Sequence, residues 1–368
     1  MPVTLSEAEQ KYSAFERPVA YFKVNDAKLS GETLIYKDIR VSLTTGMEAS
    51  ECTVEIEGRN SRFDDGELIL DDELSKLTLG AKLEVFLGYG KADDAESVFV
   101  GYISALEYDL QGEAVTEFVT AMDCKQFMMS SYRSLRKKDI KKYSEAVVDV
   151  LKNYSAVYTG TEVEGTDEVL SPIEQHGQSD YDFVVALAKK LNYLFYVVAG
   201  KVYFVSYGKF TDSVLTVEPG RNLYRMRREV TLANQVKSVT VRNHNPEDAE
   251  KPFESKAVTV KSVGGGSKTS AEATKLINDN MEKTVVDNSV RSEAEAKARA
   301  EALLGEMSMG FLTGSMEIPG LPPVIPGHMV TVKKMTEELN RDYFITQVSH
   351  HVDKDGFQTT IHFAGNKT

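Results

Sequence analysis

Histidine and cysteine side chains are the groups in this sequence that could bind a metal ion. The six histidines are His176, His244, His328, His350, His351 and His362. None of them falls in an H-E-x-x-H arrangement, and Cys52 and Cys124 form no C-x-x-C pair. His350, His351 and His362 could meet across a C-terminal hairpin, but scattered histidines on facing strands are usually polar edges. We therefore predict no metal site, and this hairpin is the place where one could still form.

Acidic side chains could instead act as a general acid and a general base. Glu174 and Asp180 would suit lysozyme-like hydrolysis of a glycoside. The chain has 56 Asp and Glu residues, so such pairs arise by chance, and Asp180 and Asp182 fit the first turn of a helix. The sequence contains no G-x-S-x-G, P-loop or G-x-G-x-x-G motif. We predict no catalytic residue and no cofactor, and hence a protein that is not an enzyme.

The charge balance argues against nucleic acid as a partner. Lys and Arg number 43, and the formal net charge is -13, whereas phosphate binding needs clustered basic residues. The cationic stretch RSLRKKDIKK (133–142) is expected to be a solvated helix start or a contact with an acidic neighbour. The sequence has no apolar run long enough for a transmembrane helix and no Sec-type leader. With two cysteines, the chain is expected to fold in a reducing cytoplasm.

Alternating apolar and polar residues predict strands in the first third of the chain. Cys52, Val54 and Ile56 alternate with polar residues, which is typical of a strand with one buried face. The predicted strand regions are 35–58, 80–90 and the hairpin 99–124. Such a run of strands is typical of a barrel or a sandwich.

Helical periodicity begins after residue 138. A helix is predicted over 139–158, and a capping signal at Ser179 and Asp182 predicts another directly before two short strands, 193–198 and 201–205. The clearest helix is 291–309, which opens with a capping box at Ser292 and Glu295. Its alanines at 294, 298 and 302 are predicted to pack on a sheet.

The front and rear parts of the sequence repeat one order of features. Each has an alternating pair of strands, a helix or a helical hint, a glycine-led strand and a hairpin. The glycine-led strands are GAKLEV (80–85) and GHMVTV (327–332), and the hairpins lie at 102–121 and 343–365. When the hairpins are aligned on their turn glycines, the arms differ in length by two residues. We interpret the repeat as two copies of one β module.

Four further stretches occur in a characteristic order: SPIEQHGQSDYDFVVALAKKLNYLFYVVAGKVYFV (171–205), NQVKSVTVRNHNP (234–246), SEAEAKARAEALL (292–304) and YFITQVSHHVDKDGFQTTIHF (343–363). Together they resemble the central hub proteins of contractile tails. These proteins are the phage late-control D family, the baseplate hub of contractile phages and the N-terminal half of the type VI secretion spike. No single motif is specific, and the resemblance depends on the order of the set.

The resemblance implies a mainly β, α+β fold of two tail-tube-like β-barrel domains with an α/β domain inserted between them. The expected boundaries are 1–127 for the first barrel, 128–215 for the inserted domain and 216–368 for the second barrel with helix 291–309. Two modules per chain would give a trimer six similar positions around a lumen, and therefore a pseudo-sixfold ring.

The function implied by the resemblance is that of a structural baseplate hub. Such a hub adapts a sixfold tail tube to a threefold spike and provides the ejection channel. The expected partners are two further copies, a tube or tube-initiator protein on one face, a spike on the other and further baseplate proteins. Neither specific nucleic-acid binding nor membrane insertion is expected.

The particle and two alternatives remain open at this stage. Because the sequence stops at Thr368, the spike is expected to be a separate protein, which favours a phage tail, a tailocin or an extracellular injection particle over a type VI spike. The chain would be made in the bacterial cytoplasm and incorporated into that particle. The alternatives are a tail-associated cell-wall hydrolase and a tail-tip module that binds a receptor or carbohydrate.

Overall fold

The computed structural model describes residues 5–12, 15–65, 67–111, 114–136, 139–248, 250–275 and 280–368. Within these residues, thirteen strands form one sheet. The strands are β1 (Pro18–Val24), β2 (Ala27–Lys28), β3 (Leu34–Thr44), β4 (Glu51–Gly58), β7 (Lys82–Tyr89), β8 (Glu96–Gln111), β9 (Ala114–Met122), β15 (Ser213–Val217), β16 (Arg225–Val230), β20 (Leu312–Pro319), β21 (Met329–Val332), β22 (Asp342–Asp353) and β23 (Gly356–Gly365).

Smaller sheets and helices complete the chain. The small sheets pair β5 (Arg62–Asp64) with β6 (Glu67–Ile69), β10 (Tyr132–Arg136) with β12 (Glu174–Ser179), β14 (Lys201–Ser206) with β11 (Gly160–Val163) and β13 (Tyr193–Val198), and β17 (Ser238–Asn243) with β18 (Phe253–Ala257) and β19 (Glu282–Val286). The helices are α1 (Leu5–Lys11), α2 (Lys125–Met129), α3 (Tyr143–Leu151), α4 (Asp180–Leu191), α5 (Ser270–Lys275), α6 (Glu293–Ser308) and the short η2 (Leu74–Lys76), η3 (Ala92–Asp94) and η4 (Lys152–Tyr154). The predicted mainly β, α+β class is confirmed.

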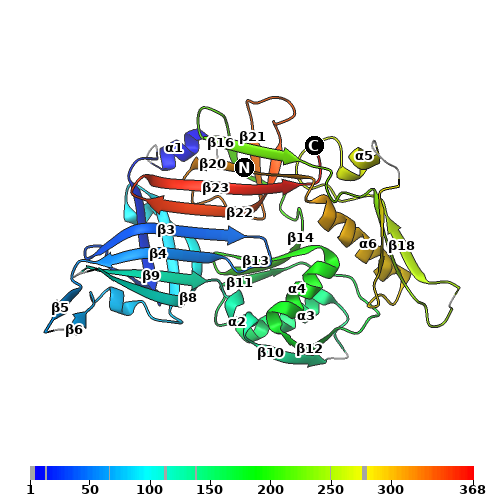
Figure 1. Ribbon diagram of the computed structural model, residues 1–368, viewed down its shortest axis with the longest axis horizontal. Helices are drawn as coiled ribbons and strands as arrows, with labels where there is room; N and C mark the ends of the chain where they lie inside the picture. The colour runs from blue at the N-terminus through cyan, green and yellow to red at the C-terminus, as the bar shows by residue number, and fades with distance from the viewer. Residues whose placement is uncertain are drawn as a thin grey trace.

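The large sheet consists of two units with the same strand order. The front β unit runs β3-β4-β9-β8-β7-β1, and the rear β unit runs β16-β20-β23-β22-β21-β15 (Figure 1). Each strand of one unit thus has a counterpart at the same place in the other, although β1 is antiparallel to β7 and β15 is parallel to β21. Among the described residues, the hydrogen-bonded order forms one open sheet and does not close into two rings.

The two units also share local irregularities. The backbone N–H of Gly80 donates to the carbonyl of Ile103 at 2.8 Å, and that of Gly327 donates to Ile345 at 2.9 Å. In both hairpins the pairing register then shifts, directly after Ile103 and after Ile345. A β-bulge at the same place in both copies makes Ile103 the structural counterpart of Ile345.

The hairpin arms are equal in length, so the glycine-based alignment of the sequences was wrong. Gln111 pairs with Ala114 at the front turn, and Asp353 pairs with Gly356 at the rear turn. Counting from the shared bulge, Ala114 rather than Gly112 is the counterpart of Gly356; Gly112 itself lies outside the described residues. Gly356 has a φ of +131°, which glycine adopts readily, and a turn glycine can change place without altering the strands.

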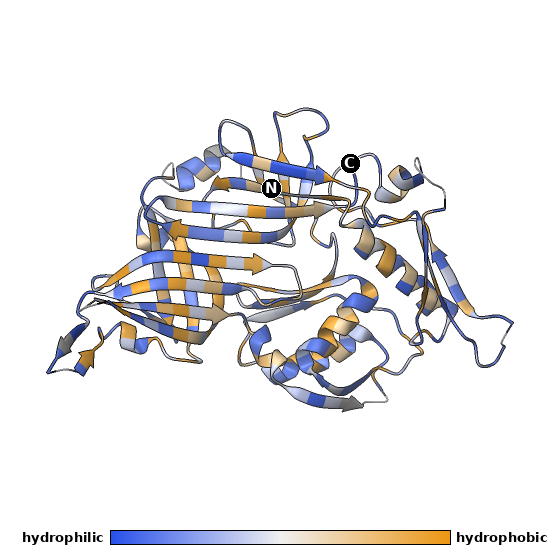
Figure 2. Cartoon of the chain, in the orientation of Figure 1, coloured by the Kyte–Doolittle hydropathy of each residue, from blue (hydrophilic) through white to orange (hydrophobic). Residues whose placement is uncertain are grey.

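The two units join where β22 pairs with β3, a boundary that we call the seam. Its antiparallel register runs from Gln347 opposite Thr44 to Val352 opposite Ile39. Apolar side chains on the inner face, such as Val348 and Leu43, belong to one core that contains residues from both units. Figure 2 shows the matching alternation of apolar and polar residues along these strands.

The inserted segment packs against both β units through its own three-stranded sheet. Successive side chains of β13 point to opposite faces. Phe195 and Val197 join the core beneath α3 and α4, while Leu194 and Tyr196 pack against Met329 and other residues of the rear unit. The two predicted short strands are confirmed as β13 and β14, and the helix predicted over 139–158 begins later, at Tyr143.

Helix α6 covers the small sheet formed by β17, β18 and β19. Ser292 is its N-cap, because the hydroxyl accepts a hydrogen bond from the backbone N–H of Glu295 at 3.1 Å, but the predicted capping box is not completed: the Glu295 carboxylate accepts from the backbone N–H of Arg291 at 2.7 Å. The predicted packing stripe was wrong at two of its three positions: Ala302 is buried, but Ala294 and Ala298 are exposed. Ala296 and Ala300 are fully buried instead. Alanine repeats at several helical spacings here, so the sequence alone did not define the buried face.

Candidate functional site

The three C-terminal histidines do not converge. His350 is fully buried on the inner face of β22, with its Nδ1 atom 2.9 Å from the hydroxyl of Thr359. His351 points to the opposite face. His362 is exposed on β23, where it lies opposite Gln347. The residue of β23 opposite His351 is Gln358, four residues away from His362. Four residues correspond to about 13 Å along a strand.

His351 instead belongs to an acidic cluster on the outer face of the seam. Its Nε2 atom lies 2.8 Å from Asp38 and 3.7 Å from Asp353. The three side chains could share a cation in principle, but Arg40 already occupies both oxygens of Asp38, at 2.8 and 3.2 Å. Burial would raise the pKa of Asp38, yet hydrogen bonds from Arg40 and His351 lower it below the usual value. The cluster links β22 to β3 through the contact between His351 and Asp38.

The candidate acid–base pair is divided between separate contacts. Glu174 lies 2.9 Å from His176 at the surface. Asp180 is fully buried at the start of α4, where it accepts hydrogen bonds from Tyr154 at 2.7 Å and from Gln175 at 2.8 Å. A carboxylate held in this way stabilises the insert, and the geometry does not resemble a catalytic pair.

The cationic stretch begins as strand β10 and not as a helix. Arg133 lies 3.4 Å from the buried Asp180, and residues 137–138 lie outside the described part of the chain.

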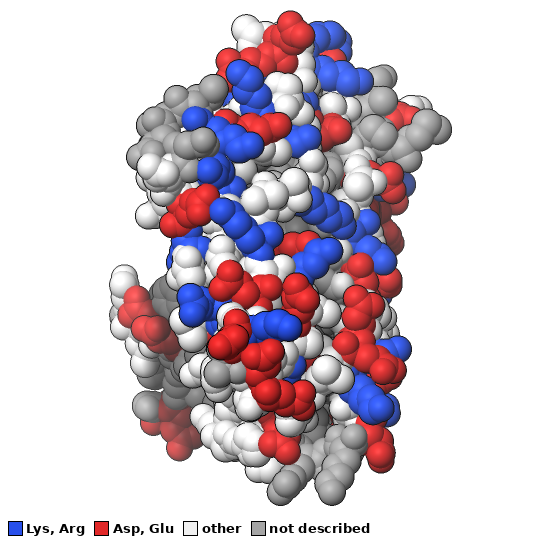
Figure 3. Space-filling view, turned by 90° about the vertical axis from the view of Figure 1, so that its right-hand side faces the viewer, with Lys and Arg blue, Asp and Glu red and all other residues white. Residues whose placement is uncertain are grey.

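Positive and negative side chains are mixed on the face at the right of Figure 1. Figure 3 shows this face, with Lys and Arg beside Asp and Glu over most of the surface. No helix in the described part of the chain is both long and apolar enough to cross a membrane.

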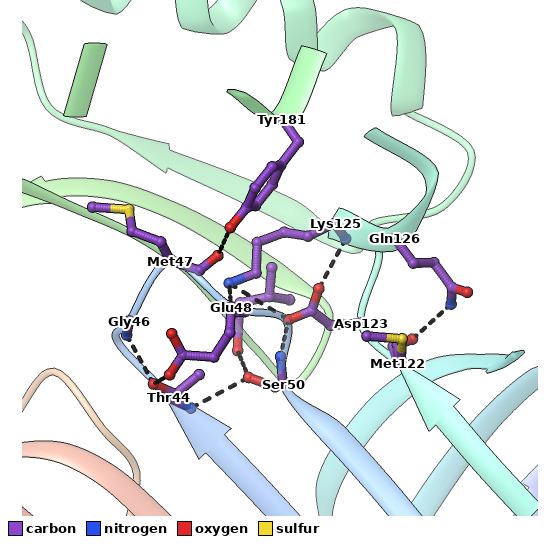
Figure 4. Close-up of polar contacts among 11 residues, drawn as sticks. Thr44, Gly46, Met47, Glu48, Ser50, Met122, Asp123, Lys125, Gln126 and Tyr181 are labelled. Carbon is purple, nitrogen blue, oxygen red and sulfur yellow. Dashed lines mark hydrogen bonds and ion pairs between the residues drawn. The ribbon is translucent and has the colours of Figure 1, made fainter. Parts of the chain in front are cut away.

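A buried charge pair lies at the end of the front β unit, where this unit meets the insert, and we call it the junction (Figure 4). The Lys125 and Asp123 side chains are 0% and 1% exposed, and their charged atoms lie 3.9 Å apart. Asp123 also accepts backbone hydrogen bonds from Ser50 at 2.7 Å and Lys125 at 2.8 Å. Lys125 donates to the carbonyl of Glu48. Burial raises the pKa of Asp123 and lowers that of Lys125, while each charge opposes the shift of the other.

Further hydrogen bonds extend the junction to the insert. The hydroxyl of Tyr181 on α4 donates to the carbonyl of Met47, and the hydroxyl of Ser50 donates to Val197 on β13. Gln126 donates to the carbonyls of Met122 and Tyr102 at 3.0 and 3.1 Å. The loop between β3 and β4 is therefore fixed to both the helices and the sheet of the insert. The junction was not predicted from the sequence, because Asp-Cys-Lys at 123–125 has the composition of an exposed turn.

A second buried carboxyl lies inside the front β unit. Glu117 on β9 is 0% exposed and lies opposite Tyr108 of β8 and Ile56 of β4. Burial raises the pKa of Glu117 to about 7. The carboxyl thus holds its proton in the folded chain at pH values where an exposed glutamate would be ionised.

Glu117→Gln is expected to make stability less dependent on pH. Above the ordinary pKa of 4.5 the unfolded chain releases this proton, whereas the folded chain keeps it up to about pH 7. Glu117 therefore lowers stability as pH rises through this window, by no more than about 3 kcal/mol. Urea unfolding between pH 4.5 and 7.5 should show that the free energy of unfolding of the variant increases relative to that of the parent protein as the pH rises. Equal pH profiles would contradict the assignment, and Glu107→Gln, an exposed change in the same hairpin, is the control.

Comparison with known proteins identifies the family. Residues 64–354 match the family model described as Alg8 N-terminal domain. The chain belongs to this family. No curated protein matches its sequence.

Two solved structures with a similar fold are described as tail proteins. The 43 kDa tail protein of prophage MuSo2 from Shewanella oneidensis has a TM-score of 0.69 at 12% identity, covering 94% of this chain and 98% of that one. A tail protein from Neisseria meningitidis MC58 has a TM-score of 0.66 at 14% identity, with 95% and 96% covered. The predicted resemblance to baseplate hub proteins is thus confirmed for the fold.

A similar fold also occurs in a secretion system. The E. coli c3393 protein, described as a component of the type VI secretion system with structural similarity to the T4 tail proteins gp27 and gp5, has a TM-score of 0.55 at 8% identity. The match covers 94% of this chain and 77% of that one.

Proposed function

We propose that the chain is the structural central hub of the baseplate of a contractile tail or injection particle. The observation that carries this proposal is the repeated β unit, in which the same six-strand order occurs twice around one seam. Three chains of this kind would present six similar β units around an axis. Such a ring would match a sixfold tail tube on one face and a threefold spike on the other, with the ejection channel at its centre.

The proposed domains are 1–127, 128–215 and 216–368, the second of which is the insert between the two β units. The proposed partners are two further copies, a tube or tube-initiator protein, a spike and other baseplate proteins. We propose a non-enzymatic role, and the occupied carboxylates at Asp180 and Asp38 support it. The chain would be made in the bacterial cytoplasm and become part of a tail baseplate.

Self-association tests the proposal. Light scattering on the purified chain, alone and with candidate tube and spike proteins, should give a mass three times that of the 40.9 kDa chain. Negative-stain images should show a ring with a central hole. A monomer under all these conditions would contradict the hub, and cleavage of peptidoglycan on a zymogram would support the hydrolase instead.

A further inference from the structure

Two edges of the large sheet lack a partner strand in the described part of the chain. Strand β16 pairs with β20 on one side only. Strand β8 pairs with β7 as far as Tyr102, and beyond this residue it pairs with β9 alone. In the strand order β16 is the first strand, whereas β8 is followed by β7, so that only the part of β8 beyond Tyr102 is an edge; Figure 1 shows β16 near the top of the molecule and β8 below β9. Open edges of this kind can pair with strands of another chain.

Inside the chain, the counterparts of these two edges already pair. In the repeated order, β3 corresponds to β16, and β22 corresponds to β8. The seam formed by β3 and β22 is thus a template for a contact between β16 and β8. Because each chain has one β16 edge and one β8 edge, the repeated contact would run head to tail from copy to copy.

We infer that β16 of one copy pairs antiparallel with the free edge of β8 in the next copy, in the register of the seam. Arg40 lies opposite His351 in the seam, and their counterparts are Arg227 and Asp109. Arg227 of one copy would then lie opposite Asp109 of the next. This inference rests on the proposed function and identifies the surface through which the ring assembles.

Exposed apolar side chains at the two edges support this register. In the seam, Leu43 lies opposite Val348, and the counterparts of these two residues are Val230 and Leu106. Val230 is 41% exposed in the single chain, and Leu110, which would lie opposite Met226, is 50% exposed. The contact would remove these apolar surfaces from water, as the seam does for its own apolar pairs.

The charges of the two edges are complementary. The outer face of β16 carries Arg225 and Arg227, whereas the outer face of β8 carries Glu107 and Asp109. Asp38 of β3 contacts His351 of β22 across the seam. The counterpart of Asp38 is Arg225, and the counterpart of His351 is Asp109. The contact between copies would therefore have its acidic and basic side chains exchanged between the two strands. Glu229 would lie opposite Glu107, and Arg227 on the same face offsets this repulsion diagonally.

On the inner face, the inferred contact would place a cation one strand away from a buried acid. Arg228 has a side chain that is 11% exposed and an ion pair with Glu338 at 2.8 Å, but its Nε and Nη2 atoms have no hydrogen-bond partner in the described part of the chain. In the inferred register it lies opposite Tyr108 of the next copy, one strand from Glu117. Arg228 would thereby bring a positive charge towards a carboxyl that is buried without one.

Paired cysteines test the inferred register. Arg227→Cys with Asp109→Cys places two thiols directly opposite each other across the contact, at a separation that suits a disulfide. Mild oxidation should link chains into dimers and trimers on non-reducing gels. The native Cys52 and Cys124 are buried and should not react. Two kinds of control should cross-link roughly tenfold less. The single variants each have only one of the two thiols. The variant with Arg227→Cys and Ala105→Cys moves the thiol on β8 by four residues, about 13 Å along the strand.

Charge reversal provides an independent measurement. Arg227→Glu should weaken trimer formation by roughly tenfold or more, because it places like charges opposite each other. Adding Asp109→Lys should restore assembly, which a misfolded variant could not do. If the variant with Arg227→Cys and Asp109→Cys forms trimers but its two introduced thiols do not link, the edge pairing would be overturned while the hub stays intact. A chain that stays monomeric and unlinked at every concentration, with and without tube and spike proteins, would overturn both proposals.

Discussion

Asp123→Ala is expected to lower the free energy of unfolding by about 3–5 kcal/mol, because it leaves the ammonium group of Lys125 buried without its counter-charge. The substitution also removes the acceptor for the backbone N–H groups of Ser50 and Lys125. Water cannot replace these contacts easily, since the side chains are 0% and 1% exposed. Urea unfolding followed by far-ultraviolet circular dichroism measures the loss.

A second variant separates the charge effect from packing. Removing both charges, with Asp123→Asn and Lys125→Met together, should recover much of the stability that Asp123→Ala loses, because no unpaired charge stays buried. Asp72→Ala, a change at an exposed aspartate, should alter stability by less than about 0.5 kcal/mol. A loss at Asp123 as small as that at Asp72 would mean that the junction does not hold the insert in place.

Local patterns in the sequence predicted the elements with one buried face. Strand β4 buries Cys52, Val54 and Ile56, as their alternation with polar residues indicates. The capping signal at Ser179 also forms: its hydroxyl accepts a hydrogen bond from the backbone N–H of Asp182 at 3.0 Å. Both features depend on residues within a few positions of each other, and such contacts leave a periodic trace in the sequence.

Contacts between distant parts of the chain left no such trace. The seam pairs β3 with β22 across almost the whole sequence, and nothing in either strand specifies the other as its partner. The equal hairpin arms became visible only through the bulges at Ile103 and Ile345, which are properties of strand pairing. Nothing in the sequence around Lys125 indicates that this lysine is buried, because the contacts of its ammonium group with Asp123 and Glu48 form only in the folded chain.

Val348→Asp is expected to lower the free energy of unfolding by about 4 kcal/mol or more, because it buries a carboxyl in the core of the seam. Val348 is fully buried, and it pairs with Leu43 of β3 on one side and Ile361 of β23 on the other. Ser349→Asp is the matched control. Ser349 is the next residue of the same strand, points to the opposite face and is only partly buried, so this change should cost far less.

Hydrogen exchange on the Val348→Asp variant can show whether the two β units unfold together. The apolar residues of both units form one core, and an unpaired charge at the seam disturbs the strands on both sides of it. Amide protection should therefore fall in β3 and in β22 to a similar extent. If β3 kept its full protection while β22 lost it, the front and rear units would be separate cooperative units. The seam would then be a docking contact between two folded modules, and the head-to-tail contact inferred between copies would have the same character.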